Sequence, residues 1–171
     1  MSSTWSHKSV YRTTKCFSPQ TNGYPGGFPV GFLKWVKEQG WWGTSRVYLC
    51  AGRVEDPQSI RVDLRPETNP THLQDARQTT LPAESANWVM IDPPYTVALA
   101  ERLYNTQKHW GSINQFTKEG RRLLRVGGLL LTLSYEVPKR VADCDLVACV
   151  GVYQTISVAH MRCFTVWQRL S

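Results

Sequence analysis

The chain has 171 residues, of which 42% are hydrophobic, and a formal net charge of +7. This length suits a single domain with a substantial core, and no apolar run approaches the about 18 residues that cross a bilayer, so we expect no membrane partner. Five cysteines without a Cys-x-x-Cys pair argue against a disulfide framework and against a structural zinc site, so no metal is expected.

The N-terminal segment comes first in chain order. Residues 1–14 lack the apolar stretch of a signal peptide, and we expect a flexible arm there, followed by a single domain at residues 15–171. Without such a signal, and with cysteines that read as reduced, the expected location is the cytoplasm of a bacterial or phage-infected cell, or its nucleoid.

Short apolar stretches predict the first half of the fold. Apolar residues from Phe28 to Val36 recur at helical spacing, and Gly40 follows as a stop signal. Four strands are then predicted, at residues 45–52, 59–64, 71–77 and 87–92. The first three are joined by links too short for a full crossover helix, which needs about a dozen residues. We therefore expect shortened crossover helices and an open apolar face of the sheet that a partner covers.

Longer patterned segments predict the second half. Residues 96–107 and 112–126 are amphipathic and predict helices, the second ending before a glycine pair. The continuous apolar run at 128–135 predicts a buried strand, and residues 138–144 predict one or two helical turns. The last two strands are predicted as an antiparallel hairpin at residues 145–155 and 162–170. This order indicates an α/β fold with a mostly parallel sheet that ends in the hairpin.

The strand at residues 87–92 runs into an unusual corner, Asp92-Pro93-Pro94-Tyr95. Two prolines fix two φ angles and remove two backbone donors, which leaves a stiff corner with unpaired carbonyls. The corner resembles the signature of the amino-methyltransferases that modify N6 of adenine or N4 of cytosine. The resemblance implies that Asp92 and the Pro93 carbonyl accept the two amine hydrogens and that Tyr95 stacks on a base swung out of its helix. A simple strand–turn–helix corner is the alternative interpretation.

The same resemblance implies a Rossmann-like class I methyltransferase that binds S-adenosylmethionine. Cys50, Ala51 and Gly52 stand where the family has its cofactor loop, although the family pattern has two glycines and this chain keeps one. Asp63 would bind the cofactor ribose, as acids do at strand ends of nucleotide-binding sheets, and Asp75 stands near the position of the cofactor adenine. Asp92 also belongs to the implied cofactor site.

A further part of the resemblance lies before the cofactor loop. Tyr24, Gly26 and Gly27 in "NGYPGGFPV" resemble the segment that contacts the methionine part of the cofactor. The family has a lysine where this chain has Phe28. Lys15, or backbone N–H groups of the two glycines, would then take over the contact with the cofactor carboxylate.

The order of these motifs favours an enzyme that methylates N6 of adenine in DNA. An RNA N6-adenine methyltransferase is the first alternative, because the basic charge suits either nucleic acid. A non-catalytic, methyltransferase-like subunit that binds nucleic acid is the second, suggested by the reduced cofactor loop and the missing lysine. Cytosine N4 is less favoured, because that subgroup more often has serine in place of Asp92.

Partners follow from the same features. We expect nucleic acid, with DNA favoured over RNA, because the charge is basic and the chain has seven tryptophans and seven tyrosines. The motifs are too closely spaced to hold an inserted recognition domain. Sequence recognition would then come from a homodimer or from another subunit of a complex. Ser134 and Tyr135, at the end of the strand at 128–135, are expected near the target-base pocket.

Overall fold

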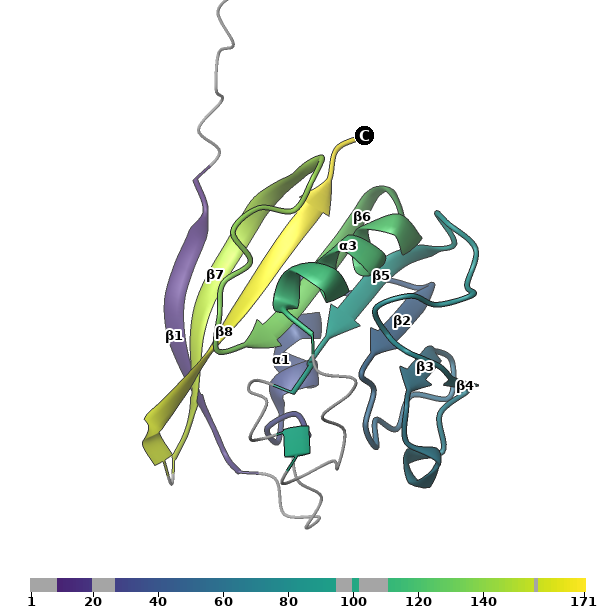
Figure 1. Cartoon of the computed structure of the whole chain (residues 1–171). Helices are drawn as coiled ribbons and strands as arrows, with labels where there is room; N and C mark the ends of the chain where they lie inside the picture. Colours follow the sequence, from purple (N-terminus) through teal and green to yellow (C-terminus); the bar gives the residue numbers. More distant parts are fainter. Residues whose placement is uncertain (1–8, 20–26, 95–99, 102–110, 156) are drawn as a thin grey trace, which may run out of the picture.

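A single mixed sheet of eight strands forms the frame of the computed structural model, which describes residues 9–19, 27–94, 100–101, 111–155 and 157–171 (Figure 1). The strand order is β1-β7-β8-β6-β5-β2-β3-β4. The strands are β1 (Tyr11–Phe17), β2 (Arg46–Leu49), β3 (Ile60–Asp63), β4 (His72–Leu73), β5 (Ala86–Ile91), β6 (Leu124–Ser134), β7 (Cys144–Gln154) and β8 (Ser157–Arg169). Neighbouring strands are parallel except where β8 pairs with β6 and β7. The predicted α/β fold with a C-terminal antiparallel hairpin is confirmed.

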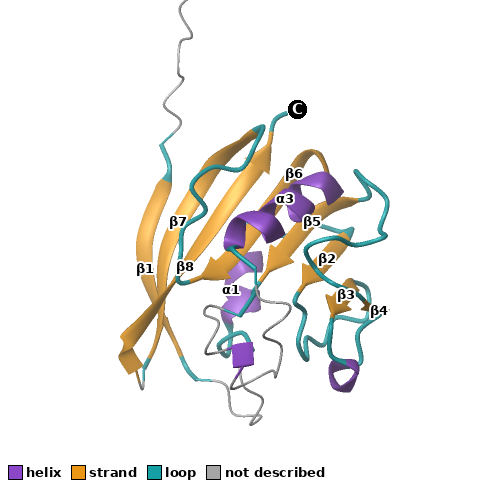
Figure 2. Cartoon of the chain, viewed as in Figure 1, coloured by secondary structure: helices purple, strands orange, loops and turns teal. Residues whose placement is uncertain are grey.

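Two helices cover opposite faces of this sheet. Helix α1 (Phe32–Glu38) lies behind the sheet in Figure 2, and α3 (Ile113–Leu123) lies in front of it. Helix α1 buries Phe32, Trp35 and Val36, which share one side because they are three or four residues apart. In the described part of the chain, no helix is long and apolar enough to span a membrane.

Shortened crossovers are confirmed in the first half of the sheet, but the open apolar face is not. A loop at residues 50–59 joins β2 to β3, and the 3₁₀ turn η1 (Pro66–Thr68) lies between β3 and β4. Asp56 in the first loop binds Arg46 with both carboxylate oxygens, at 2.7 and 2.8 Å, and accepts the Tyr48 hydroxyl at 3.3 Å. The Tyr48 side chain is 1% exposed. The loop thus takes the place of a helix over Tyr48, and its Val54 packs on the same cluster. Val47 and Leu49, on the other face of β2, are buried in the core under α3.

Three sequence expectations differ from the structure. Strand β1 includes residues 11–14, which were expected in a flexible arm, because the segment pairs in parallel with β7 and Phe17 packs on α1. The helix expected to reach residue 126 ends at Leu123, because Leu124 adopts an extended backbone and pairs with Ala86. No helix forms at residues 138–144. Of the helix expected at 96–107, only Ala100 and Glu101 are described, and both are helical.

Candidate functional site

The candidate site lies at the edge of the sheet where the parallel strands β2, β3, β4 and β5 end, hereafter the carboxyl edge. Leu49 pairs with Val62 on one side and with Ile91 on the other. The residues that follow these strands therefore emerge side by side. The Asp92 N–H donates to the Leu49 carbonyl at 3.4 Å, which ties the start of the proline corner to the turn after β2.

The turn after β2 contains the Cys50-Ala51-Gly52 sequence that was predicted to form the cofactor loop. Cys50 has φ 60° and Gly52 has φ 53°, so the backbone is left-handed at both positions. A left-handed backbone is unusual for cysteine and persists only when neighbouring contacts impose it. Here the Ala51 N–H donates to the Val62 carbonyl at 3.0 Å and the Gly52 N–H donates to Asp63 Oδ2 at 2.8 Å.

Asp63 fixes this turn from the end of β3. Its side chain is 6% exposed. Oδ1 accepts the backbone N–H of Arg65 at 3.0 Å and its Nε at 3.3 Å. Burial raises the pKa of the Asp63 carboxyl above its ordinary value, although backbone N–H groups of Gly52, Arg65 and Leu64 work in the opposite direction.

Cys50 lies among the acids that the sequence predicted for this site. Burial raises the pKa of its thiol well above the ordinary 9.0, and the charges of Asp63, Asp92 and Asp75 raise it further. All three acids therefore act electrostatically on one thiol at the carboxyl edge. The fold brings together residues that are up to 42 positions apart in the sequence, since Asp92 follows Cys50 by that number.

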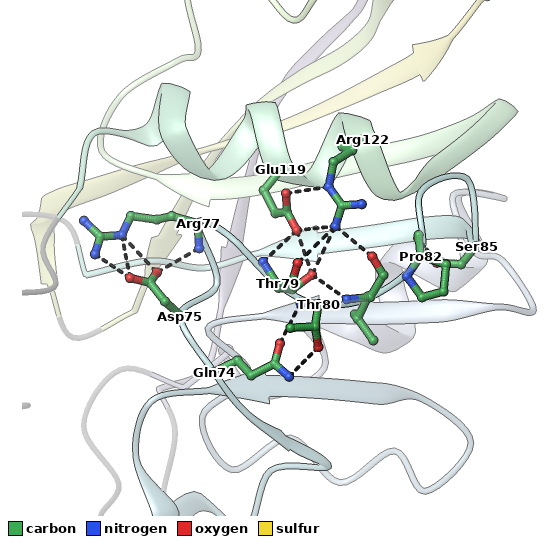
Figure 3. A network of polar contacts seen from close by, with 10 residues as sticks. Gln74, Asp75, Arg77, Thr79, Thr80, Pro82, Ser85, Glu119 and Arg122 are labelled. Carbon is green, nitrogen blue, oxygen red and sulfur yellow. Dashed lines mark hydrogen bonds and ion pairs between the residues drawn. The ribbon is translucent and has the colours of Figure 1, made fainter.

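Asp75, in the loop after β4, is held by an arginine that the sequence analysis did not single out. Its Oδ1 accepts the backbone N–H and the Nε of Arg77, both at 2.9 Å (Figure 3). The same spacing recurs at Asp63 and Arg65, where the arginine two residues later also donates both groups to Oδ1. An acid near the end of a predicted strand, followed two positions later by arginine, was the signal that could have identified both arginines.

The loop that carries Asp75 and Arg77 is anchored to α3. Glu119, whose side chain is 6% exposed, accepts the backbone N–H of Thr79 at 2.9 Å and its hydroxyl at 2.6 Å. Arg122 binds the same carboxylate, as Figure 3 shows. Its guanidinium also donates to the Leu81 carbonyl at 2.8 Å. Burial acts to raise the pKa of Glu119, but the hydrogen bonds from Arg122 and Thr79 outweigh it, and the pKa is lowered.

The proline corner is described as far as Pro94. Asp92 is half-buried, Pro93 is buried and Pro94 is half-buried. Tyr95 lies outside the described residues, as do Tyr24 and Gly26. Gly27 is described and is half-buried. Phe28, where the family has a lysine, stacks on Phe32 with a centroid distance of 5.5 Å, so this position belongs to the aromatic core behind the sheet.

The comparisons with known proteins agree with this geometry at the level of fold. No family model matches the chain, and no curated protein sequence does. Among solved structures, yhhF from Escherichia coli, a proposed methyltransferase, matches with a TM-score of 0.56 at 12% identity over 89% of this chain and 91% of that one. The chain has the Rossmann-like methyltransferase fold.

Two further methyltransferase-fold structures are similar to the chain. The 1,6-didemethyltoxoflavin-N1-methyltransferase of Burkholderia thailandensis, solved with bound S-adenosylhomocysteine, matches with a TM-score of 0.53 at 11% identity over 80% of this chain and 75% of that one. TrmN from Thermus thermophilus matches with a TM-score of 0.52 at 16% identity over 81% of this chain and 48% of that one. Similarity at this level of identity shows the fold alone, so the substrate has to be argued from the site.

Proposed function

We propose that the chain transfers a methyl group from S-adenosylmethionine to N6 of adenine in DNA. The observation that carries the proposal is the placement of two acids beside the Cys50–Gly52 turn at the carboxyl edge. Asp63 accepts the Gly52 N–H, and the Asp92 N–H donates to the Leu49 carbonyl directly before the turn. Open α/β sheets bind nucleotides at this edge, and an acid followed by two prolines stands next to the turn.

The residues at the carboxyl edge fit the proposed cofactor. Gly52 lacks a Cβ, so a ligand can approach its backbone closely. The Asp63 carboxylate lies at the end of β3, where acids of nucleotide-binding sheets bind a ribose hydroxyl. S-adenosylhomocysteine bound to the Burkholderia methyltransferase supports a cofactor of this class. When bound, the cofactor would supply a methyl group on a positively charged sulfur.

The chemical role of the chain falls on the proline corner. An exocyclic amine is a weak nucleophile because its lone pair is delocalised into the base. The Asp92 carboxylate and the Pro93 carbonyl are two acceptors that can hold the amine hydrogens and favour a pyramidal nitrogen. Pro93 and Pro94 keep these acceptors aimed because their φ angles are fixed. Tyr95 is proposed to stack on the base.

Partner and location follow from the proposed substrate. A chain with a net charge of +7 suits DNA, and a DNA-modifying enzyme works in the cytoplasm or at the nucleoid. The homodimer, or a complex with another subunit, stays a prediction, and its test is given in the Discussion.

The test of the proposed function is a transfer assay with separate nucleic-acid pools. The purified protein is incubated with cofactor labelled in the methyl group and with either DNA or RNA, and the products are digested to nucleosides. Label in N6-methyldeoxyadenosine is the expected result. Label in N6-methyladenosine from RNA, or no label in either pool, would contradict the proposal and favour the RNA enzyme or the non-catalytic subunit, respectively.

A further inference from the structure

The connection between β6 and β7, residues 135–143, occupies a place where no described helix lies. Helix α3 packs on β5 and β6. The connection instead passes across the face of β8 on the α3 side of the sheet (Figure 1). It starts at the carboxyl edge, because Thr132 pairs with Ile91 and Ser134 is two residues further along β6. If the pairing of Ile91 with Thr132 is continued by three residues on each strand, Tyr135 stands opposite Pro94 of the corner.

The start of the connection is held in a fixed shape. The Ser134 hydroxyl accepts the Glu136 N–H at 2.9 Å and donates to the Glu136 carbonyl at 2.7 Å. Pro138 is buried, and Val141 is 3% exposed within the core under α3. The segment is therefore anchored at Ser134, Pro138 and Val141, and its other side chains lie between these anchors.

Those other side chains are apolar or basic. Tyr135 is 41% exposed and Val137 is 45% exposed, two residues apart in the bend that follows β6. Lys139 and Arg140 follow and are both exposed, and Glu136 is the one acid between residues 135 and 140. Exposed apolar side chains beside cations suit a partner with flat, stackable groups and negative charge.

Strand β1 extends this surface. Its Tyr11 contacts Trp41 on the α1 side, so Arg12 and Thr14 point to the α3 side by the alternation of strand residues. Thr14 pairs with Gly151, which pairs with Cys163, which pairs with Ser134. A row of small residues thus connects the end of β6 to the polar residues of β1.

We propose that residues 135–140 form a duplex-DNA-binding element in which Tyr135 and Val137 fill the gap left by the displaced adenine while Lys139 and Arg140 contact the flanking phosphates. This proposal rests on the proposed function, because a gap in the stack exists only when a base is turned out of a duplex. Apolar side chains inserted beside a displaced base are a known way to stabilise an opened stack. Arg12, on the far side of the row, contacts the backbone of the same duplex.

Binding measurements without the cofactor test this element. Fluorescence anisotropy is recorded with a 20-base-pair duplex across a salt series and with the same duplex carrying one adenine–adenine mismatch. The double variant Lys139→Gln/Arg140→Gln should lower the slope of log affinity against log salt by about two. The control variant Lys34→Gln/Lys37→Gln removes the same charge from exposed positions of α1, on the opposite face, and should leave the slope close to that of the wild type.

Two variants test whether the aromatic ring of Tyr135 contributes to binding. Tyr135→Ala should weaken binding to the mismatched duplex about tenfold, the scale of one lost base–aromatic stack, and should lower the preference for the mismatch. Tyr135→Phe keeps the ring and should bind as the wild type does. The proposal is overturned if the wild type does not bind duplex DNA, if it binds RNA more tightly than DNA, or if the loop variants behave as the α1 control does.

These outcomes separate the binding element from the proposed chemistry. Loss of DNA binding in the loop variants, together with no methyl transfer by the wild type, would uphold the element and reject the proposed function. Adenine methylation by the wild type with unchanged binding by the loop variants would uphold the proposed function and reject the element.

Discussion

Asp92 is the side chain on which methyl transfer should depend most strongly. Asp92→Ala removes an acceptor that would orient the target amine, and it leaves the Gly52–Asp63 hydrogen bond in place. The single-turnover rate should fall by about 10² or more, as when one preorganised polar group is removed from a transition state. Cofactor affinity, measured by calorimetry, should stay within a few-fold of the wild type. Near-normal methylation by this variant would reduce the corner to a turn.

Tyr95 should affect substrate use more than chemistry. Tyr95→Ala removes a stacking surface worth about 1–3 kcal/mol per base and should raise the KM for DNA. Tyr95→Phe keeps the ring and should change both kcat and KM little. Steady-state kinetics on the two variants separate stacking from hydroxyl chemistry, and a large loss in Tyr95→Phe would favour a role for the hydroxyl.

Asp63 should make cofactor binding sensitive to acid. Its pKa is raised, chiefly by burial, so the carboxyl takes up a proton at a higher pH than an ordinary aspartate does. Protonation removes acceptor capacity, and cofactor affinity should therefore decrease as pH falls through the raised pKa. Calorimetry between neutral and acidic pH should show this decrease in the wild type, and Asp63→Asn should bind more weakly with a flatter pH profile. A wild-type profile as flat as that of the variant would exclude Asp63 from the contact.

The sequence identified the acidic residues at the ends of strands, but it did not identify the side chains that hold these acids in place. Asp63, Asp75 and Asp92 were singled out because short local motifs resemble those of the methyltransferase family. Their partners depend on how strands are ordered, which the pattern does not contain. The short-range pairs Asp63–Arg65 and Asp75–Arg77 are the exception, since an arginine two residues away can reach the acid within one turn.

The Glu119 network is the principal support of the loop after β4. Glu119→Ala would remove the acceptor of two bonds from Thr79 and of the Arg122 pair, leaving a buried N–H unpaired. We expect the free energy of unfolding to fall by about 2–3 kcal/mol, the scale of hydrogen bonds to a charged group. Urea denaturation measures this. Glu38→Ala, which breaks the exposed Lys34–Glu38 pair, is the control and should cost about 0.5 kcal/mol or less.

The stabilisation that the Glu119–Arg122 pair provides should depend on pH. The pKa of Glu119 in the folded protein lies below the ordinary 4.5. Its contribution to stability is therefore complete above 4.5 and is lost as pH falls through the lowered value. The difference in unfolding free energy between wild type and Glu119→Gln should shrink at acidic pH. A difference that stays constant down to pH 3 would show that shape, not charge, stabilises this contact.

The predicted boundaries of helices and strands were wrong where tertiary contacts override local sequence patterns. The amphipathic pattern continues to residue 126, but Leu124 joins the sheet opposite Ala86, and its backbone becomes extended. Residues 138–144 have helical composition, yet Val141 is drawn into the core under α3 and the segment stays a loop. Residues 11–14 have no apolar run, because β1 lies at the edge of the sheet with its first five residues exposed, so burial gave the sequence no signal.

The class of the sheet could be predicted from the sequence, but the complete order of its strands could not. Alternating and continuous apolar strands indicated a parallel sheet with a final hairpin, and β1 beside β7 was not anticipated. The prediction of an open apolar face was wrong for a related reason. A loop anchored by one acid, Asp56, covers the Tyr48 side of β2, and α3 covers the other side. A pattern of short links does not reveal what the link residues bind.

The assembly state is the prediction that belongs to the whole molecule. The apolar residues of β2 are buried, so the reason to expect a homodimer is DNA recognition. One chain presents the proposed element at residues 135–140 once. Two copies related by a twofold axis would present it twice along a duplex. The exposed Arg12 and Lys15 on β1 oppose edge-to-edge pairing of two β1 strands, so the sheet edge is not the expected interface. Sedimentation velocity at micromolar concentration should give twice the 19.5 kDa of the chain, alone and with cofactor. A single species at 19.5 kDa under both conditions would contradict the homodimer, and the enzyme would then have to read DNA as one domain or with a different subunit.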